Sequence, residues 1–253
     1  MSNTRKRFYN ALGIGITLLI WELAGQYMGD ALLAPPSSVA GTFVELLFES
    51  DMVLKLIGSL QLALAGFGLA CLIGMPLGAM MGRSAVIDAL VHPWISMLVV
   101  TSVAAILPIY ILLFGTGDQF RVAIIFTASV GYIVLTAYHG ARGIDPKHID
   151  VARAFSTGRV DTYRKVIMPA LFPYLITGAR LGLVHALRAM IVAEMFVISG
   201  YGGLIFHTGL DISTAPILAY LLLLMAVSLG ANMVLQRIGQ AAAPWYEARM
   251  QRA

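Results

Sequence analysis

The stretch Ala141–Pro169 reads ARGIDPKHIDVARAFSTGRVDTYRKVIMP and is the one long polar interruption between two strongly apolar regions of the chain. Most other connections in so apolar a chain are short. A long, basic segment that also carries helix signals is typical of a surface that docks a soluble partner. The stretch therefore predicts that this chain is one component of a larger machine and not a self-contained enzyme.

Two short helices are predicted within this stretch. Asp145 can cap a helix whose first residue is Pro146, because proline is tolerated at that position. This helix would run to about Phe155, the segment Ser156-Thr157-Gly158 would break it, and a second short helix would follow to Pro169. A helix–turn–helix with an apolar tip and a basic rim suits a groove on a cytosolic protein. An amphipathic loop on anionic lipid fits the same residues, which alone leave both interpretations open.

The rest of the chain is apolar enough to lie in a membrane. Of its 253 residues, 59% are hydrophobic and 12% are charged, and the mean hydropathy is +0.83. Ordinary globular domains carry about twice that share of charge. Several apolar runs approach the ~20 residues that a helix needs to cross a bilayer. We predict an all-α membrane protein with about six transmembrane helices, at residues 9–28, 55–82, 87–115, 119–140, 172–199 and 215–236.

Proline and small residues predict further features of these spans. The third span contains Pro108 and should be kinked or broken there. Small residues recur every four positions in two spans, at Gly74, Gly78 and Gly82 and at Gly178, Gly182 and Ala186. This spacing predicts close packing of those spans against neighbouring helices.

The distribution of charge predicts the orientation in the membrane. With six spans, the basic clusters before the first span, in 141–169 and after the last span fall on one side, together with both termini. Basic residues collect in cytoplasmic loops, so that side should be cytoplasmic. The predicted parts are a tail and first span at 1–28, an extracytoplasmic segment with a surface helix at 29–54, a membrane core at 55–240 that contains the loop 141–169, and a cytoplasmic tail at 241–253.

Catalytic signatures are absent from the sequence. No lysine follows a glycine, which excludes a phosphate-binding Gly-Lys-Ser/Thr loop. No two histidines lie three or four residues apart, so no helical metal pair exists, and no Gly-x-Ser-x-Gly elbow is present. We therefore expect no enzyme activity, no metal and no cofactor in this chain. The net charge of +4 is explained by the cytoplasmic loops, so membrane lipid and not nucleic acid is the expected partner.

The polar stretch resembles the cytoplasmic loop of permease subunits of binding-protein-dependent ABC importers. Their pattern is Glu-Ala-Ala, three residues, Gly, nine residues, Ile, one residue and Leu-Pro. Aligned on Pro169, this chain has Asp150-Val151-Ala152 for Glu-Ala-Ala, Val166 for Ile and Met168-Pro169 for Leu-Pro. Ser156 departs from the pattern because it replaces the glycine at the turn, and Gly158 stands two residues later.

Other segments resemble the nitrate, sulfonate, taurine and bicarbonate group of these permeases. They are Leu33–Val39, Pro108–Gly117, Ala193–Phe196 and Gly200–Ile205, so the resemblance covers about residues 32 to 235. It implies a type I ABC importer permease fold in a bacterial inner membrane. It also implies a second copy of this chain, two cytosolic ATPase subunits that bind ATP and Mg, and an extracytoplasmic solute-binding protein.

The same resemblance assigns residues to coupling. It implies that a coupling helix in this loop sits in a groove of each ATPase. The implied coupling residues are Asp150, Val151, Ala152, Arg153, Ala154, Phe155, Ser156, Thr157, Gly158, Arg159 and Pro169.

Ionisable residues in the fifth span are candidates for the substrate path. Arg180 and Arg188 lie eight residues apart, roughly on one helical face, and two copies of the chain would double this positive lining. That favours a small anionic solute such as nitrate, a sulfonate or taurine. Alternatively, Arg180 snorkels to the cytoplasm and Arg188 pairs with Glu194 or a carbonyl. Glu194, as a gate or partner, and Pro108 are assigned to the same path.

Two other classes of protein compete with this interpretation. A stand-alone secondary transporter or channel would work without an ATPase and predicts similarity between the two halves of the chain, which we do not find. A membrane-embedded enzyme needs a catalytic constellation. The spacing of the loop motif favours the ABC permease over both.

Overall fold

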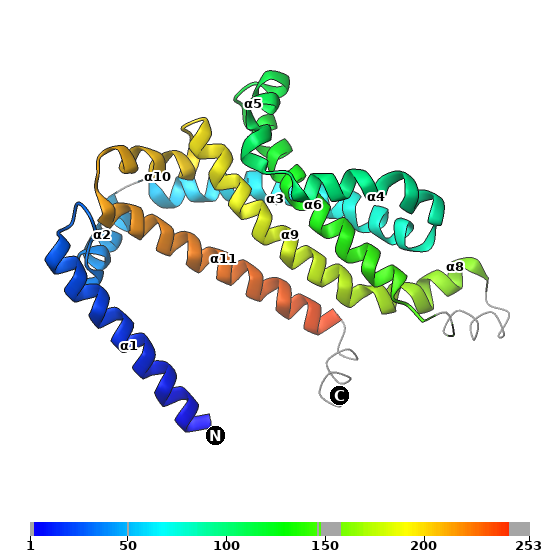
Figure 1. Ribbon diagram of the computed structural model, residues 1–253, viewed down its shortest axis with the longest axis horizontal. Coiled ribbons are helices and arrows are strands. Elements are labelled where there is room, and N and C mark those ends of the chain that lie inside the picture. The colour runs from blue at the N-terminus through cyan, green and yellow to red at the C-terminus, as the bar shows by residue number, and fades with distance from the viewer. Residues whose placement is uncertain (1–2, 50, 146, 148–157, 243–253) are drawn as a thin grey trace. The chain divides into compact units, whose positions relative to one another are not determined.

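The computed structural model describes residues 3–49, 51–145, 147 and 158–242, and every regular element among them is a helix (Figure 1). The N-terminal half contains α1 (Asn3–Met28), α2 (Pro36–Glu49), α3 (Met52–Arg83), α4 (Ala85–Val100), α5 (Val103–Phe114) and α6 (Asp118–Arg142). The C-terminal half contains α8 (Arg159–Thr162), the π-helical η1 (Tyr163–Ile167), α9 (Met168–Phe196), α10 (Gly200–Leu210) and α11 (Thr214–Ala242).

Five of these helical stretches are long and apolar enough to cross a membrane. They are Arg7–Met28, Met52–Arg83, Asp118–Arg142, Tyr163–Phe196 and Thr214–Ala241. A sixth is obtained if the bent pair α4 and α5 is counted as one span. The prediction of an all-helical protein with about six spans is confirmed, because unbroken apolar length is a local property of the sequence.

The break in the third span lies elsewhere than predicted. α4 and α5 meet at an angle of 106°, and the break is at Thr101 and Ser102, whose ψ angles are 132° and 123°. Thr101 ends α4 because both its N–H and its hydroxyl donate to the carbonyl of Met97, at 3.0 and 2.7 Å. Pro108 lies inside α5, so the prediction of a break at this proline is wrong. A single missing N–H is tolerated within a membrane helix when neighbouring groups compensate.

The predicted end of a helix at Pro169 is also wrong. Helix continues from Arg159 to Phe196 through the π-helical turn η1, in which the N–H of Met168 donates to the carbonyl of Tyr163, five residues earlier. Pro169 has no N–H, so it already interrupts the regular ladder of hydrogen bonds. A π turn inserts one extra residue at that interruption and allows the helix to go on.

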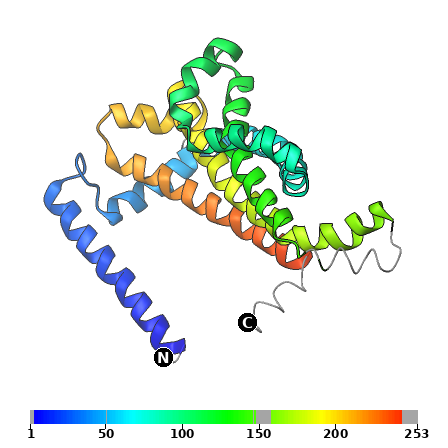
Figure 2. The same ribbon diagram turned by 45° about the vertical axis from the view of Figure 1, so that its right-hand side comes forward.

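The chain divides into two compact units, one of residues 1–58 and 194–227 and the other of residues 59–193 and 228–253. The second unit is built around α6, which α4 and α5 contact (Figure 2). Small residues of α3 and α9 lie against α6 from further sides. A Cβ added to Gly78 would lie 2.3 Å from the Val134 carbonyl oxygen, and one added to Gly182 would lie 2.6 Å from Ile133 Cδ1. The predicted close packing at these glycines is confirmed.

The first unit joins the segment after α1 to α10 and the start of α11. The indole N–H of Trp21 donates to the Ala34 carbonyl at 3.1 Å, and the Ala34 N–H donates to the Thr214 hydroxyl at 2.9 Å. Glu22 accepts hydrogen bonds from both the N–H and the hydroxyl of Ser37, at 3.1 and 2.7 Å. Because Ser37 lies in the first turn of α2, this carboxylate occupies the favourable end of the helix dipole.

A tight turn between α9 and α10 completes this unit. Gly200 has φ of +61° and Ile198 has φ of +52°, and the buried Glu194 accepts a hydrogen bond from the Gly202 N–H at 2.9 Å. Tyr201 is fully buried and donates to the Tyr220 carbonyl at 2.7 Å. Burial raises the pKa of Tyr201 above its ordinary value, because the charged phenolate is disfavoured away from water.

Candidate functional site

The candidate coupling segment begins where α6 ends. Gly143 caps α6 through its N–H to the His139 carbonyl, and the next residue, Ile144, is buried. Asp145 then accepts a hydrogen bond from the Lys147 N–H at 2.9 Å. A side-chain oxygen that accepts from the N–H two residues later makes the bond that is typical of an N-cap. The local geometry at Asp145 is therefore that of the predicted cap.

Most of the predicted coupling residues, 150–157, lie outside the residues that the structure describes. The description resumes at Gly158, whose carbonyl accepts from the N–H and the hydroxyl of Thr162, at 3.0 and 3.1 Å. Arg159 is the first residue of α8, and Pro169 lies in the first turn of α9. The coupling assignment of these residues stays a prediction.

The continuity of α8, η1 and α9 joins the coupling segment to the candidate path. An unbroken helix runs from Arg159 past Arg180 and Arg188. The helix thus joins the end of the coupling segment to both arginines with no loop between them, although its ladder of hydrogen bonds changes at the π turn before Pro169.

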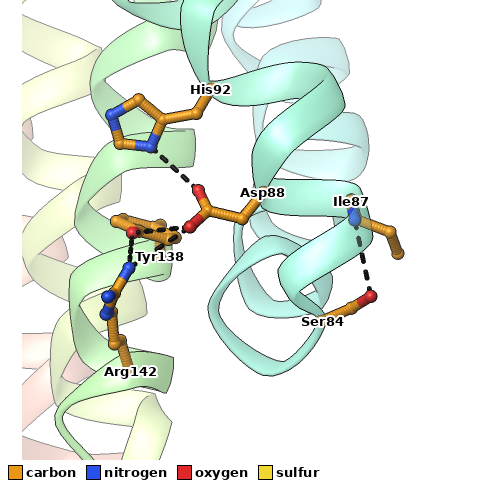
Figure 3. Close-up of polar contacts among 6 residues, drawn as sticks. All are labelled: Ser84, Ile87, Asp88, His92, Tyr138 and Arg142. Atoms are coloured by element: carbon orange, nitrogen blue, oxygen red, sulfur yellow. Dashed lines mark hydrogen bonds and ion pairs between the residues drawn. The ribbon is translucent and has the colours of Figure 1, made fainter.

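A polar cluster that the sequence analysis missed lies at the start of the coupling segment. We call this start, residues 142 to 147, the segment root. Figure 3 shows Asp88 and His92 of α4 facing Tyr138 and Arg142 of α6. The Asp88 carboxylate lies 3.0 Å from His92 Nδ1, and it accepts from the Tyr138 hydroxyl at 3.1 Å and from Arg142 Nη1 at 3.2 Å. Arg142 also donates to the Tyr138 hydroxyl oxygen. The spacing of four within each pair was a usable signal, since such residues share a helix face.

The candidate path residues do not form one cluster. Arg180 donates from Nε to Asn232 Oδ1 of α11 at 2.8 Å, so a side chain of the same unit holds its guanidinium. Arg188 is exposed, and one turn before it the His185 ring stacks on Tyr132 of α6, with centroids 3.6 Å apart. The two arginines therefore differ in availability, and Arg188 is the one open to a ligand.

Glu194 and Pro108 occupy different settings. The Glu194 side chain is 0% exposed and bonds to the turn at Gly202, where it holds the start of α10. Pro108 is exposed on α5, and the next turn is tied to α6 by a 2.7 Å bond between the hydroxyls of Tyr110 and Thr127. Their assignment to the path stays a prediction. Within the described ranges, no group of three or more His, Cys, Asp and Glu side chains could hold a metal ion.

Comparison with known proteins places the chain in a sequence family. The family described as binding-protein-dependent transport system inner membrane component matches residues 74–244, more than half of the chain. A probable ABC transporter permease protein of Brucella abortus (strain 2308) is 27% identical, with 93% of this chain and 97% of that protein covered.

Two further relatives have names that state a solute. The putative aliphatic sulfonates transport permease protein SsuC of Bacillus subtilis (strain 168) is 28% identical, with 76% of this chain and 71% of that protein covered. The taurine transport system permease protein TauC of Escherichia coli (strain K12) is 22% identical, with 92% of this chain and 88% of that protein covered.

A solved structure has the same fold. A chain of the MetNI methionine ABC transporter, in an inward-facing conformation, matches with a TM-score of 0.68 at 17% identity, covering 75% of this chain and 95% of that chain. At this identity the match speaks for the fold alone. The predicted fold class, an all-helical membrane protein of the importer permease type, is confirmed.

Proposed function

Because the chain belongs to the family of binding-protein-dependent transport system inner membrane components, we propose that it forms the translocation path of an ATP-driven importer for a small anionic solute. The family match confirms the resemblance that the sequence analysis drew from Ala141–Pro169. As a permease subunit the chain is a membrane component of an ABC importer. The proposal extends to its coupling, its partners and its solute.

The single observation that carries the coupling proposal is that helix continues from Arg159 to Phe196 with no loop between them. We propose that segment 141–169 of each copy of the chain docks in a groove on one of two cytosolic ATPase subunits, which bind ATP and Mg. A second copy of the chain and an extracytoplasmic solute-binding protein complete the assembly. Closure of the ATPases would displace the segment, and the continuous helix would carry that displacement to the path. We propose that both termini lie on the same side of the membrane as this segment, in the cytoplasm of a bacterial cell.

The anionic solute is supported by the exposure of Arg188 and by the names of two relatives. A guanidinium at membrane depth is costly and usually faces a cavity or a partner. Arginine also binds planar or tetrahedral oxyanions through two parallel N–H donors. Two relatives are named for aliphatic sulfonates and for taurine. Nitrate, sulfonates and taurine are therefore the solutes to test first.

Co-purification tests the proposed assembly directly. The tagged chain, extracted in mild detergent, is expected to retain a cytosolic ATPase in stoichiometric amount. In contrast, a pure oligomer of this chain that transports solute into liposomes without ATP would overturn the proposal. That result would favour a stand-alone secondary transporter.

Charged replacements in the coupling segment are expected to uncouple the importer. Ala154→Arg with Phe155→Glu should reduce ATP-dependent transport at least about tenfold, because a well-packed anchor at an interface commonly contributes about 2 kcal/mol or more. Transport and ATP hydrolysis are measured together in proteoliposomes. The matched control is Arg237→Glu, which changes the charge of an exposed side chain near the end of α11, outside the segment. Normal coupled transport in the first variant would contradict the docking assignment.

Arg188 is expected to set the preference for anions. Arg188→Gln should lower uptake of the probes methanesulfonate, nitrate and taurine, the last through its sulfonate group, by about tenfold, because one charge-assisted hydrogen bond is lost. Arg188→Lys should retain more uptake than Arg188→Gln, since it keeps the charge. Arg237→Gln removes an exposed arginine near the end of α11 and serves as the control. Equal uptake by Arg188→Gln and the unaltered protein would contradict the contact with solute.

A further inference from the structure

The polar cluster of Asp88, His92, Tyr138 and Arg142 has no place in the proposed path, yet it lies where the coupling segment begins. Arg142 is the last residue of α6, and Asp145 caps the segment three residues later. Asp88 lies in the first turn of α4, which Ser84 caps by accepting from the Ile87 N–H. The cluster therefore connects α4, and through it the bent α4–α5 pair, to the first residues of the segment (Figure 3).

The carboxylate of Asp88 is the hub of these bonds. One of its oxygens meets His92 Nδ1, and the other accepts from both Tyr138 and Arg142. Tyr138 is 4% exposed and presents its hydroxyl from the α6 side, with the His92 ring edge-on at a centroid distance of 5.1 Å. Removing Asp88 would leave three donors from two helices without their common acceptor.

The charges of Asp88 and Arg142 favour a contact between α4 and α6. Asp88 stands at the N-terminal, positive end of α4, and Arg142 stands at the C-terminal, negative end of α6, so each charge is favoured by its own helix dipole. The Arg142 side chain is 65% exposed, and ion pairs this open contribute little to folding stability. α4 and α6 are held together independently by apolar packing, in which Val99 and Leu98 lie against Gly131. The cluster thus fixes geometry at the segment root more than it stabilises the fold.

We propose that Asp88 is a positioning residue for the coupling segment. It ties the segment root to α4, so that displacement of the segment reaches the α4–α5 pair as well as α9. This inference rests on the proposed function, because it assigns a mechanical role to the segment that would dock the ATPase.

The position of the root can be measured without knowing the solute. Spin labels on Val86 of α4 and on Lys147, both exposed, report the distance between α4 and the segment root in a Cys71→Ala background. The protein is the complex purified with its ATPase, measured by electron paramagnetic resonance without nucleotide and with ATP and vanadate. We expect a narrow component for the distance within one copy of the chain, and we expect Asp88→Asn to broaden it. Asp118→Asn should leave it unchanged, because it removes the carboxylate paired with Arg121 at the opposite end of α6.

A functional measurement on the same complexes separates positioning from stability. In Asp88→Asn, the stimulation of ATP hydrolysis by the permease should fall at least about fivefold, the lower end of the range for coupling between sites. The amount of co-purified ATPase should stay the same. If Asp88→Asn does not accumulate, the same measurements are made on Tyr138→Phe. This variant keeps the buried ring and removes only the hydroxyl that donates to Asp88.

Two other outcomes are distinguishable. Unchanged distances and unchanged stimulation in Asp88→Asn, with the ATPase still bound, would overturn the positioning role and leave the proposed function standing. Failure of the unaltered chain to retain an ATPase would overturn the proposed function, and with it the role of Asp88 in coupling.

Discussion

Gly78→Ala is expected to destabilise the protein by about 3 kcal/mol, the upper end of the range for over-packing, although alanine is the better helix former. The added methyl group would lie 2.3 Å from the Val134 carbonyl oxygen and 2.7 Å from the Ala137 Cβ. The nearest of these atoms is backbone, so a change of side-chain rotamer cannot relieve the contact. α3 and α6 would have to separate along the interface that forms the centre of their unit.

The matched control for this variant lies in the same helix. An added Cβ on Gly68 of α3 meets nothing within 4 Å. Gly68→Ala should therefore stabilise the protein by about 0.5–1 kcal/mol through helix propensity alone. Thermal unfolding in detergent, followed by size-exclusion chromatography, measures both variants. We expect Gly78→Ala to lower the unfolding temperature and Gly68→Ala to raise it. A shift of the same sign and size in both variants would show that the α3–α6 contact is not close.

Gly200→Ala is expected to cost about 3 kcal/mol for two separate reasons. Gly200 has φ of +61°, a conformation that strains any residue with a Cβ. The added Cβ would also lie 2.3 Å from Glu194 Oε1, in the middle of the buried contact that holds the start of α10. The substitution therefore strains the backbone and displaces the carboxylate.

A double-mutant cycle separates the two effects. Glu194→Ala removes the carboxylate, so adding Gly200→Ala to it should cost only the backbone strain and less than in the unaltered protein. Gly209→Ala, in the same helix with nothing within 4 Å of the added Cβ, should not destabilise the protein. Thermal unfolding of the four cycle members and this control provides the measurement. Additive costs in the cycle would contradict the contact between Gly200 and Glu194.

The sequence predicted the parts of this molecule whose cause is local. The spans coincide with the observed helices because apolar length is read residue by residue. The repeats at Gly74, Gly78 and Gly82 predicted close packing because small residues at that spacing line one helix face. The loop pattern ending at Met168-Pro169 predicted the family, since its spacing survives the replacement of glycine by Ser156.

Two errors came from expecting a kink, a break or a helix end at a proline. Pro108 lies within α5, and the chain bends at Thr101, where a side-chain bond to Met97 helps to end α4. Pro169 follows a π turn, and the helix continues to Phe196. In both cases the surrounding structure compensates for the missing N–H, and local sequence does not report that compensation.

The remaining features depend on pairs that are distant in the sequence. Asp88 meets Tyr138 and Arg142 only because α4 packs on α6, and Arg180 meets Asn232 only because α9 packs beside α11. The partner of Glu22, Ser37, is likewise set by the chain reversal after α1. Hydrophobic periodicity determines which segments become helices, because each residue contributes to it independently. Which polar side chains meet is decided by the packing of those helices, because a hydrogen bond requires two groups at a set distance and angle, and only the tertiary structure fixes both.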